Sequence, residues 1–311
     1  MHGWTALITK GCVQSWAWER TLLDRFRRFL PRHKADPRDC TMVVGLGAMK
    51  SGTTWLTEYM SSLPGFLHSP IKEMNVFNMF ADNPYRRRND GFRLFKMEEI
   101  LLRPNPFDRP HARDQLRALA QIGHIHDTKA YLAFFAERLD GHTHIGEISP
   151  SYSHLPLETL RQVAGLTRDV RFLFLMRDPA RRAASHIRHL RRRERVDVPI
   201  DTLLAEVRPG QGVWLRSDYG FTLDRLEQAG LAAKTRVMTY EALFQDETMR
   251  GLCTWLGLPF NKPKPDKIVH PGRGEDLTQA QLDQLRDRLD PIYADLARRD
   301  LPPGAEGWRW T

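Results

Sequence analysis

Residues near position 50 combine glycine, hydroxyl and lysine side chains at spacings that suit phosphate binding. Gly47, Gly52, Thr53 and Thr54 fit the G-x-x-x-x-G frame of phosphate-binding loops. An ATP-binding loop carries its lysine directly after the second glycine, where this chain has Thr53, and the lysine here is Lys50. We therefore expect backbone N–H groups of the loop to bind a phosphate while Lys50 presents its ammonium group from an earlier position.

The sequence on either side predicts the elements that position this loop. Residues 42–44 are an apolar run, which indicates a buried strand. After the loop, apolar residues recur at helical spacing: Trp55, Leu56, Tyr59, Met60 and Leu63. A strand, a loop of small residues and a helix direct the positive end of the helix dipole at an anion. The alternative is an ordinary strand–turn–helix in which the lysine has no function.

A second basic site follows the clearest buried strand of the sequence, residues 170–176. Arg177 stands at the carboxyl end of that strand, and Ser185 lies two turns into the helix that follows. These two side chains together are suited to hold a second phosphate. A magnesium–ATP enzyme more usually ends this strand in a metal-binding aspartate, whereas here Arg177 precedes Asp178.

Glu73 follows a strand expected at residues 66–67. Open α/β sheets bind ligands at the carboxyl ends of their strands, which is where this glutamate falls. The alternative is an ordinary surface glutamate, because most glutamates are solvated. Further strands are expected at residues 143–147 and 236–239.

Residues 82–112 show little periodicity, and we expect a long loop over the sheet that contacts the substrate. Helices are expected at residues 113–122 and 128–139. His124 and His126 lie between these helices, but two alternating histidines without a third ligand do not make a metal site.

Composition indicates one globular α/β domain with anionic partners. The 311 residues include 47 basic and 38 acidic side chains, for a net charge of +9, and 41% are hydrophobic. The three cysteines form no C-x-x-C pair, so neither a disulfide framework nor a zinc site is expected. The sequence has no long apolar run that would span a membrane and no apolar core of a signal peptide, and we expect a cytoplasmic protein.

The N-terminal residues 1–40 are expected to form a basic helical extension ahead of the main domain, residues 41–311. Residues 20–30 read as an amphipathic basic helix, which allows peripheral membrane contact, although packing on the domain is the commoner outcome. Residues 191–195 are almost all arginine but lack interleaved aromatic residues, so no nucleic-acid partner is expected.

Taken together, these motifs resemble those of the sulfotransferases that use 3′-phosphoadenosine 5′-phosphosulfate (PAPS). Residues 50–56 are similar to that family's 5′-phosphosulfate loop, and residues 177–185 match its 3′-phosphate element in order and spacing. Residues 72–78 resemble the segment that carries a glutamate base in heparan sulfate-modifying and many bacterial members. Residues 146–150 are similar to another recurring segment, which often has lysine where this chain has Ile148.

The resemblance implies a parallel β-sheet flanked by helices, of the P-loop nucleotide-kinase type, in a single domain. It implies PAPS as co-substrate, adenosine 3′,5′-bisphosphate (PAP) as product, and no required metal. Lys50 would stabilise charge on the leaving oxygen, and Glu73 would remove a proton from the acceptor. The residues implied in nucleotide binding are Lys50, Ser51, Gly52, Thr53, Thr54, Trp55, Arg177, Ser185, Tyr219 and Arg273.

Several alternatives stay open on the sequence. The base of cytosolic phenol-type members is a histidine, for which the candidates are His68, His124 and His126. The acceptor is a small molecule or a glycan. An ATP-dependent kinase with a P-loop, a basic nucleic-acid or membrane adaptor, and a sulfotransferase-like protein without activity are the competing function classes.

Overall fold

The computed structural model describes residues 36–81, 88–105, 111–193, 197–263 and 277–308. Residues Asp36–Thr311 form one compact unit. The expected basic helix at residues 20–30 lies outside the described residues. None of the described helices is both long and apolar enough to cross a membrane.

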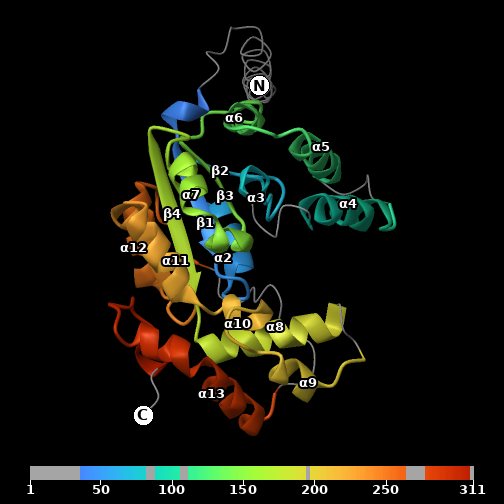
Figure 1. Cartoon of the computed structure of the whole chain (residues 1–311). Coiled ribbons are helices and arrows are strands. Elements are labelled where there is room, and N and C mark those ends of the chain that lie inside the picture. The colour runs from blue at the N-terminus through green and yellow to red at the C-terminus, as the bar shows by residue number, and fades with distance from the viewer. Residues whose placement is uncertain (1–35, 82–87, 106–110, 194–196, 264–276, 309–311) are drawn as a thin grey trace, which may run out of the picture. The chain divides into compact units, whose positions relative to one another are not determined.

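The centre of this unit is a five-stranded parallel sheet with the order β2-β3-β1-β4-β5. The expected parallel sheet is therefore confirmed, with β1 at its middle (Figure 1). The strands are β1 (Thr41–Gly47), β2 (Phe66–His68), β3 (His144–Ile148), β4 (Asp169–Met176) and β5 (Thr235–Thr239).

Helices cover both faces of the sheet (Figure 1). The described helices are α2 (Thr53–Ser61), α3 (Phe77–Phe80), α4 (Arg88–Leu101), α5 (Ala112–Ile122), α6 (Thr128–Ala136), α7 (Leu157–Ala164), α8 (Pro179–Arg193), α9 (Ile200–Ala205), α10 (Gly212–Leu215), α11 (Tyr219–Gln228), α12 (Asp246–Leu256) and α13 (Gln279–Leu296).

Alternate residues of β4 enter two different apolar cores, because successive side chains of a strand point to opposite faces. Phe172 and Phe174 pack in the larger core, with residues of α5 to α8, α11 and α13. Leu173 and Leu175 pack in the smaller core, with the apolar faces of α2 and α12. A strand buried on both faces is apolar at nearly every position, which explains why this strand was the clearest in the sequence.

The prediction of a loop over residues 82–112 was wrong, because α4 (Arg88–Leu101) forms within it. Its apolar residues do not lie on one side. Met97 and Ile100 pack against the larger core, whereas Leu94 and Phe95 are exposed. An apolar pattern spread around the helix weakens the 3.6-residue period that identifies an amphipathic helix.

The carboxyl ends of β1, β2, β3 and β4 lie at one edge of the sheet, since all four strands are parallel. The segments leaving this edge are the phosphate loop (residues 47–54), the Glu73 segment (residues 69–78), the turn at residues 149–154 and the start of α8. This is the edge where open α/β sheets bind ligands.

Candidate active site

The phosphate loop turns sharply between β1 and α2. Lys50 has φ 69° and Gly52, the N-cap of α2, has φ 93°. A Cβ at Gly52 would lie 2.7 Å from Cδ2 of Tyr240, so both the backbone and the packing require glycine. Among the described residues no side chain caps this end of α2. Its first N–H groups have no partner within the helix and are therefore suited to an anion.

Backbone strain concentrates at this edge of the sheet. Five non-glycine residues with positive φ occur in the described part of the chain, and three of them are Lys50, Glu73 and Asn75. Such conformations cost free energy and tend to persist at functional sites. The candidate lysine and the candidate glutamate are thus both held in left-handed backbone.

Lys50 is largely buried, and burial lowers the pKa of its ammonium group to about 8. The charges of Arg192, Lys72 and Arg177 contribute to this lowering, and the charge of Glu73 opposes it. The ammonium group is therefore surrounded mainly by other cations. An anion bound at the loop would relieve this repulsion and keep Lys50 protonated.

Arg177 lies beside the phosphate loop, as its place at the end of β4 predicts. Its guanidinium stacks 4.4 Å from the ring centroid of Tyr240, and Nη1 donates to the Lys50 carbonyl at 3.4 Å. Its Nε is buried and has no hydrogen-bond partner among the described residues. The structure thus brings Arg177 and Lys50 together and leaves a buried donor available.

Tyr219 is 1% exposed, and its hydroxyl donates to the Arg177 carbonyl at 2.7 Å. Burial raises the pKa of this phenol to about 12, so it stays protonated as the donor. Its observed contact positions the Arg177 backbone, and direct contact with a nucleotide stays a prediction. Ser185 is half-buried on α8, two turns beyond Arg177.

Sequence reasoning missed Arg182, the largest fully buried side chain of the described chain at 0% exposure. Its Nε donates to Ser217 Oγ at 2.7 Å and Nη2 to the Val213 carbonyl at 2.6 Å. Nη1 lies 3.5 Å from the Met49 carbonyl of the phosphate loop. Arg182 therefore ties α8 to the loop through neutral acceptors. The sequence gives no local signal for this role, because Arg181 and Arg182 are adjacent and only one of them is buried.

The surroundings of Arg182 carry a positive potential. Burial, together with the charges of Arg216 and Arg177, lowers the pKa of its guanidinium to about 10, against the opposing effect of Tyr219. Burial followed by the charge of Arg182 lowers the pKa of His186 to about 2, so this histidine is neutral. The start of α8 and the phosphate loop thus form one buried cationic region, which we call the cation cluster: Lys50, Arg177 and Arg182.

The remaining residues predicted to contact the nucleotide lie partly at the phosphate loop and partly elsewhere. Thr53 and Thr54 occupy the first turn of α2, and Ser51 is buried in the loop. Trp55 packs in the smaller core, stacked on Tyr59 with ring centroids 5.5 Å apart, so packing is its observed role and contact with adenine stays a prediction. Arg273 lies outside the described residues.

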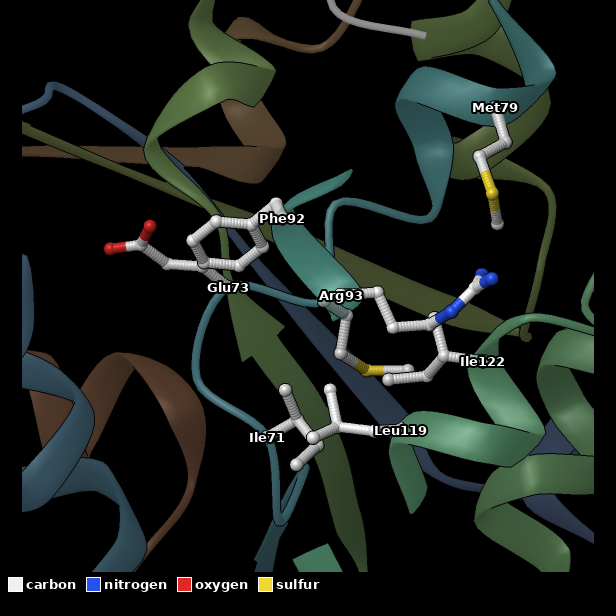
Figure 2. Close-up of a pocket in the computed structure, with 8 residues that line it drawn as sticks. Ile71, Glu73, Met79, Phe92, Arg93, Leu119 and Ile122 are labelled. Carbon is white, nitrogen blue, oxygen red and sulfur yellow. The ribbon is translucent and has the colours of Figure 1, made fainter. Parts of the chain in front are cut away.

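The Glu73 segment leaves the sheet edge next to the phosphate loop, and Lys72 contacts both the loop side and Glu73. Lys72 Nζ lies 3.4 Å from Glu73 Oε1 and donates to Thr54 Oγ1 in the first turn of α2. Both members of the ion pair keep about a third of their side chains exposed, at 39% and 31%. Figure 2 shows the Glu73 carboxylate pointing away from Leu119 and Ile122. The carboxylate is therefore open to solvent and stays close to the anion site, a link that sequence reasoning missed.

Glu147 organises the segment that carries Glu73. It is 0% exposed and accepts hydrogen bonds from Ser149 Oγ at 2.7 Å, Tyr152 OH at 2.8 Å and Tyr131 OH at 3.3 Å. The Met74 N–H, directly after Glu73, donates to Glu147 Oε2 at 3.2 Å. Burial raises the pKa of Glu147 to about 7, against the opposing effect of these donors. The buried carboxyl thus fixes the backbone that presents Glu73.

The histidines considered as alternative bases lie in different settings. His68 is at the end of β2, where burial lowers its pKa, and Nδ1 lies 2.6 Å from the Ser69 carbonyl. Its Nε2 is buried without a hydrogen-bond partner among the residues the structure describes. His124 and His126 are exposed between α5 and α6. His68 is therefore the only one of the three beside the Glu73 segment.

Comparison with known proteins identifies the chain's family. A model of the sulfotransferase family matches residues 43–262. This is more than half of the 311 residues and includes every segment at the carboxyl edge. The chain belongs to the sulfotransferase family. The resemblance of its motifs, and the expectation that it is a sulfotransferase, are confirmed.

A solved sulfotransferase shares the fold. A sulfotransferase from Alicyclobacillus acidocaldarius matches with a TM-score of 0.57 and 21% identity, over 87% of this chain and 99% of that chain. Sulfotransferase STF9 from Mycobacterium avium matches with a TM-score of 0.49 and 17% identity, over 90% of this chain and 82% of that chain. No curated protein matches the sequence.

In this sulfotransferase both carboxylate oxygens of Asp178, which follows Arg177, accept hydrogen bonds from other groups of the protein. Oδ1 accepts from the Arg181 N–H at 2.8 Å, and Oδ2 accepts from Tyr293 OH at 3.0 Å. The first bond caps the start of α8. Within the described residues, no group of three or more histidine, cysteine, aspartate or glutamate side chains is placed to hold a metal ion.

Ile148, where related sequences often have lysine, packs in the smaller core of this sulfotransferase at 3% exposure. It lies against Gly45 of β1, where an added Cβ would come within 2.6 Å of its side chain. Gly45 therefore leaves room for the Ile148 side chain because it has no side chain of its own. The side chain is packed away from solvent.

We expect Glu147→Gln to lower the free energy of unfolding by about 1–3 kcal/mol, because an amide nitrogen cannot accept two of the four hydrogen bonds. A carboxyl whose pKa is raised to about 7 stabilises the fold fully below the ordinary value of 4.5 and loses this contribution as pH rises to 7. The deficit of Glu147→Gln should therefore be larger at about pH 5 than at about pH 8. Urea unfolding at the two pH values measures it, and an equal deficit would contradict the assignment.

Proposed function

We propose that this sulfotransferase moves the sulfuryl group of PAPS to a hydroxyl or amine of its acceptor. The observation that carries the proposal is the cation cluster at the uncapped end of α2, in which the charge of Arg177 lowers the pKa of both Lys50 and Arg182. Cations buried together in this way are stabilised by a ligand of high negative charge.

The two ends of the cluster suit the two phosphates of such a nucleotide. The N–H groups of the phosphate loop and the first turn of α2, with Thr53 and Thr54, would hold the 5′-phosphate. The buried Nε of Arg177, with Ser185, would hold the 3′-phosphate. Tyr219 supports this role by fixing the Arg177 backbone. A 3′-phosphate distinguishes PAPS from ATP.

Lys50 would act on the leaving group. When bound, PAPS supplies a sulfuryl group joined to the 5′-phosphate through an S–O bond that breaks readily. As that bond breaks, its electron pair goes to the phosphate oxygen, and the ammonium group of Lys50 stabilises the new charge. The lowered pKa of Lys50, about 8, still leaves most of it protonated at neutral pH.

Glu73 would act on the acceptor. Its carboxylate takes the proton of the acceptor group while the acceptor oxygen or nitrogen forms the new bond to sulfur, in line with the leaving oxygen. Lys72 supports this role, because its contacts with both Thr54 and Glu73 keep the base beside the nucleotide loop.

The test is the binding of PAP compared with AMP, which lacks the 3′-phosphate. We expect Arg177→Ala to weaken PAP binding by roughly tenfold to a hundredfold, the range for a hydrogen bond to a charged group, with AMP binding changed little. Arg168→Ala removes the same charge from an exposed ion pair with Asp39 at the opposite edge and should change neither. Calorimetric titration measures both ligands. Equal losses for PAP and AMP would contradict the assignment of the 3′-phosphate.

A further inference from the structure

The first turn of α8 is closed by groups of the protein, unlike the first turn of α2. The Ala180 N–H donates to Tyr293 OH at 3.0 Å. The Arg181 N–H donates to Asp178 Oδ1 at 2.8 Å, and Pro179 has no N–H group. The backbone donors that a helix start offers to an anion are therefore already used, and a phosphate beside this end of α8 is left to side chains.

Tyr293 reaches this turn from α13, more than a hundred residues later in the sequence. Figure 1 shows α13, in red, alongside α8, and the two helices are in contact. Tyr293 is 7% exposed, and its hydroxyl, which accepts from Ala180, donates to Asp178 Oδ2 at 3.0 Å. Burial, followed by the charge of Asp178, raises the pKa of this phenol, so it stays protonated as the donor.

Contacts with two other elements hold α13 and the segment after it in place. Arg299 pairs with Asp224 of α11 at 2.6 Å and with Asp295 of α13 at 2.8 Å. The Pro303 carbonyl accepts from Thr239 Oγ1, at the end of β5, at 2.6 Å. The position of Tyr293 is thus fixed from outside the turn that it contacts.

The carboxylate of Asp178 is a competitor for the cation next to it. Asp178 directly follows Arg177, and a carboxylate attracts a guanidinium and repels a phosphate at short range. In the described part of the chain this carboxylate bonds instead to the Arg181 N–H and to Tyr293 OH. Without the tyrosine hydroxyl, Oδ2 would lose its partner, and Arg177 is the neighbouring cation that would replace it.

We propose that Tyr293 is a positioning residue of the nucleotide site, which holds the Asp178 carboxylate at the start of α8 and so keeps Arg177 available for the 3′-phosphate. The inference rests on the proposed function, in which Arg177 and Ser185 hold that phosphate. Tyr293 acts through Asp178 and the Ala180 N–H. Its loss should therefore weaken binding of the 3′-phosphate and leave the 5′-phosphate loop unchanged.

Tyr293→Phe tests this role, because it removes the hydroxyl and keeps the ring in the core. In calorimetric titrations of the full chain, PAP should bind about tenfold more weakly, at the lower end for a hydrogen bond to a charged group, and AMP should change by less than about twofold. Equal losses for PAP and AMP, or unchanged PAP binding, would overturn the proposal.

Tyr59→Phe is the matched control. Tyr59 is 6% exposed in the smaller core, and its hydroxyl donates to the Asn261 carbonyl at 2.8 Å. This variant also loses one buried hydroxyl, but at a site without a carboxylate that competes for Arg177. It should change neither affinity by more than about twofold, and a loss specific to PAP as large as that of Tyr293→Phe would overturn the proposal.

A second substitution separates a competing charge from a simple loosening of the turn. Asp178→Asn removes the charge and keeps an oxygen that can cap the Arg181 N–H. Alone, it should bind PAP at least as tightly as the unaltered chain. In its presence, Tyr293→Phe should weaken PAP binding by less than about threefold. A tenfold loss in that background as well, or a tenfold loss of PAP binding in Asp178→Asn alone, would overturn the proposal.

Arg177→Ala separates this inference from the proposed function. If Arg177→Ala weakens PAP and AMP binding equally, the 3′-phosphate does not lie at Arg177, and the proposed nucleotide site fails together with the role of Tyr293. If Arg177→Ala weakens PAP binding alone and Tyr293→Phe changes neither affinity, the positioning role fails and the sulfotransferase mechanism stands.

Discussion

Glu73→Gln is expected to lower turnover by roughly 10²–10⁴-fold, the usual contribution of a general base, while PAP binds as tightly as before. The amide keeps the size of the side chain and cannot take a proton. It also loses the ion pair with Lys72, but that pair is only partly buried and contributes little to stability. The loss should therefore appear in the chemical step, measured as the single-turnover rate with saturating PAPS.

His68→Gln is the matched control, because His68 leads into the same segment and is the alternative base nearest to Glu73. It should keep turnover within about threefold of the unaltered chain. A large loss in His68→Gln together with normal turnover in Glu73→Gln would transfer the role of base to the histidine.

Lys50→Ala is expected to lower the rate of the chemical step by roughly 10²–10³-fold, the range for losing one preorganised group that stabilises developing charge. PAP affinity should fall less, because the N–H groups of the loop remain. Lys234→Ala removes the same charge from the exposed residue before β5 and should leave the rate unchanged. Single-turnover rates with saturating PAPS measure the effect, and a normal rate in Lys50→Ala would contradict the role.

The pH profile carries a second test of Lys50. Catalysis requires its protonated form, so kcat/KM should fall as pH rises through about 8, the lowered pKa of the free protein. Bound PAPS adds negative charge beside the ammonium group and raises this pKa. The fall in kcat should therefore occur at higher pH than the fall in kcat/KM, and coincident falls would argue against Lys50 as the titrating group.

The central part of the fold could be predicted because its signals are local. β4 is apolar at nearly every position, and the loop around Lys50 is defined by glycines and hydroxyls at fixed spacing. These two segments follow parallel strands, so their positions in the sheet bring Lys50 and Arg177 together. Their contact through the Lys50 carbonyl agrees with that reasoning.

Glu147 and Arg182 could not be predicted, because their roles depend on segments distant in sequence. Glu147 is buried by Tyr131 of α6 and by the Glu73 segment. Met74, which donates to Glu147 from that segment, lies more than seventy residues before it in the sequence. Arg182 is fully buried, whereas its neighbour Arg181 is exposed. A run of arginines gives no local sign of which one lies inside, and only the packing of α8 on α10 and the phosphate loop decides it.

The most direct test of the account is the fate of PAPS labelled in its sulfuryl group, incubated with the full chain, a panel of alcohols, amines and sugars, and a metal chelator. The account predicts a labelled sulfated acceptor and PAP in equal amounts, with both formed far more slowly in Lys50→Ala. Formation of no PAP with any acceptor, alongside magnesium-dependent consumption of ATP, would contradict it.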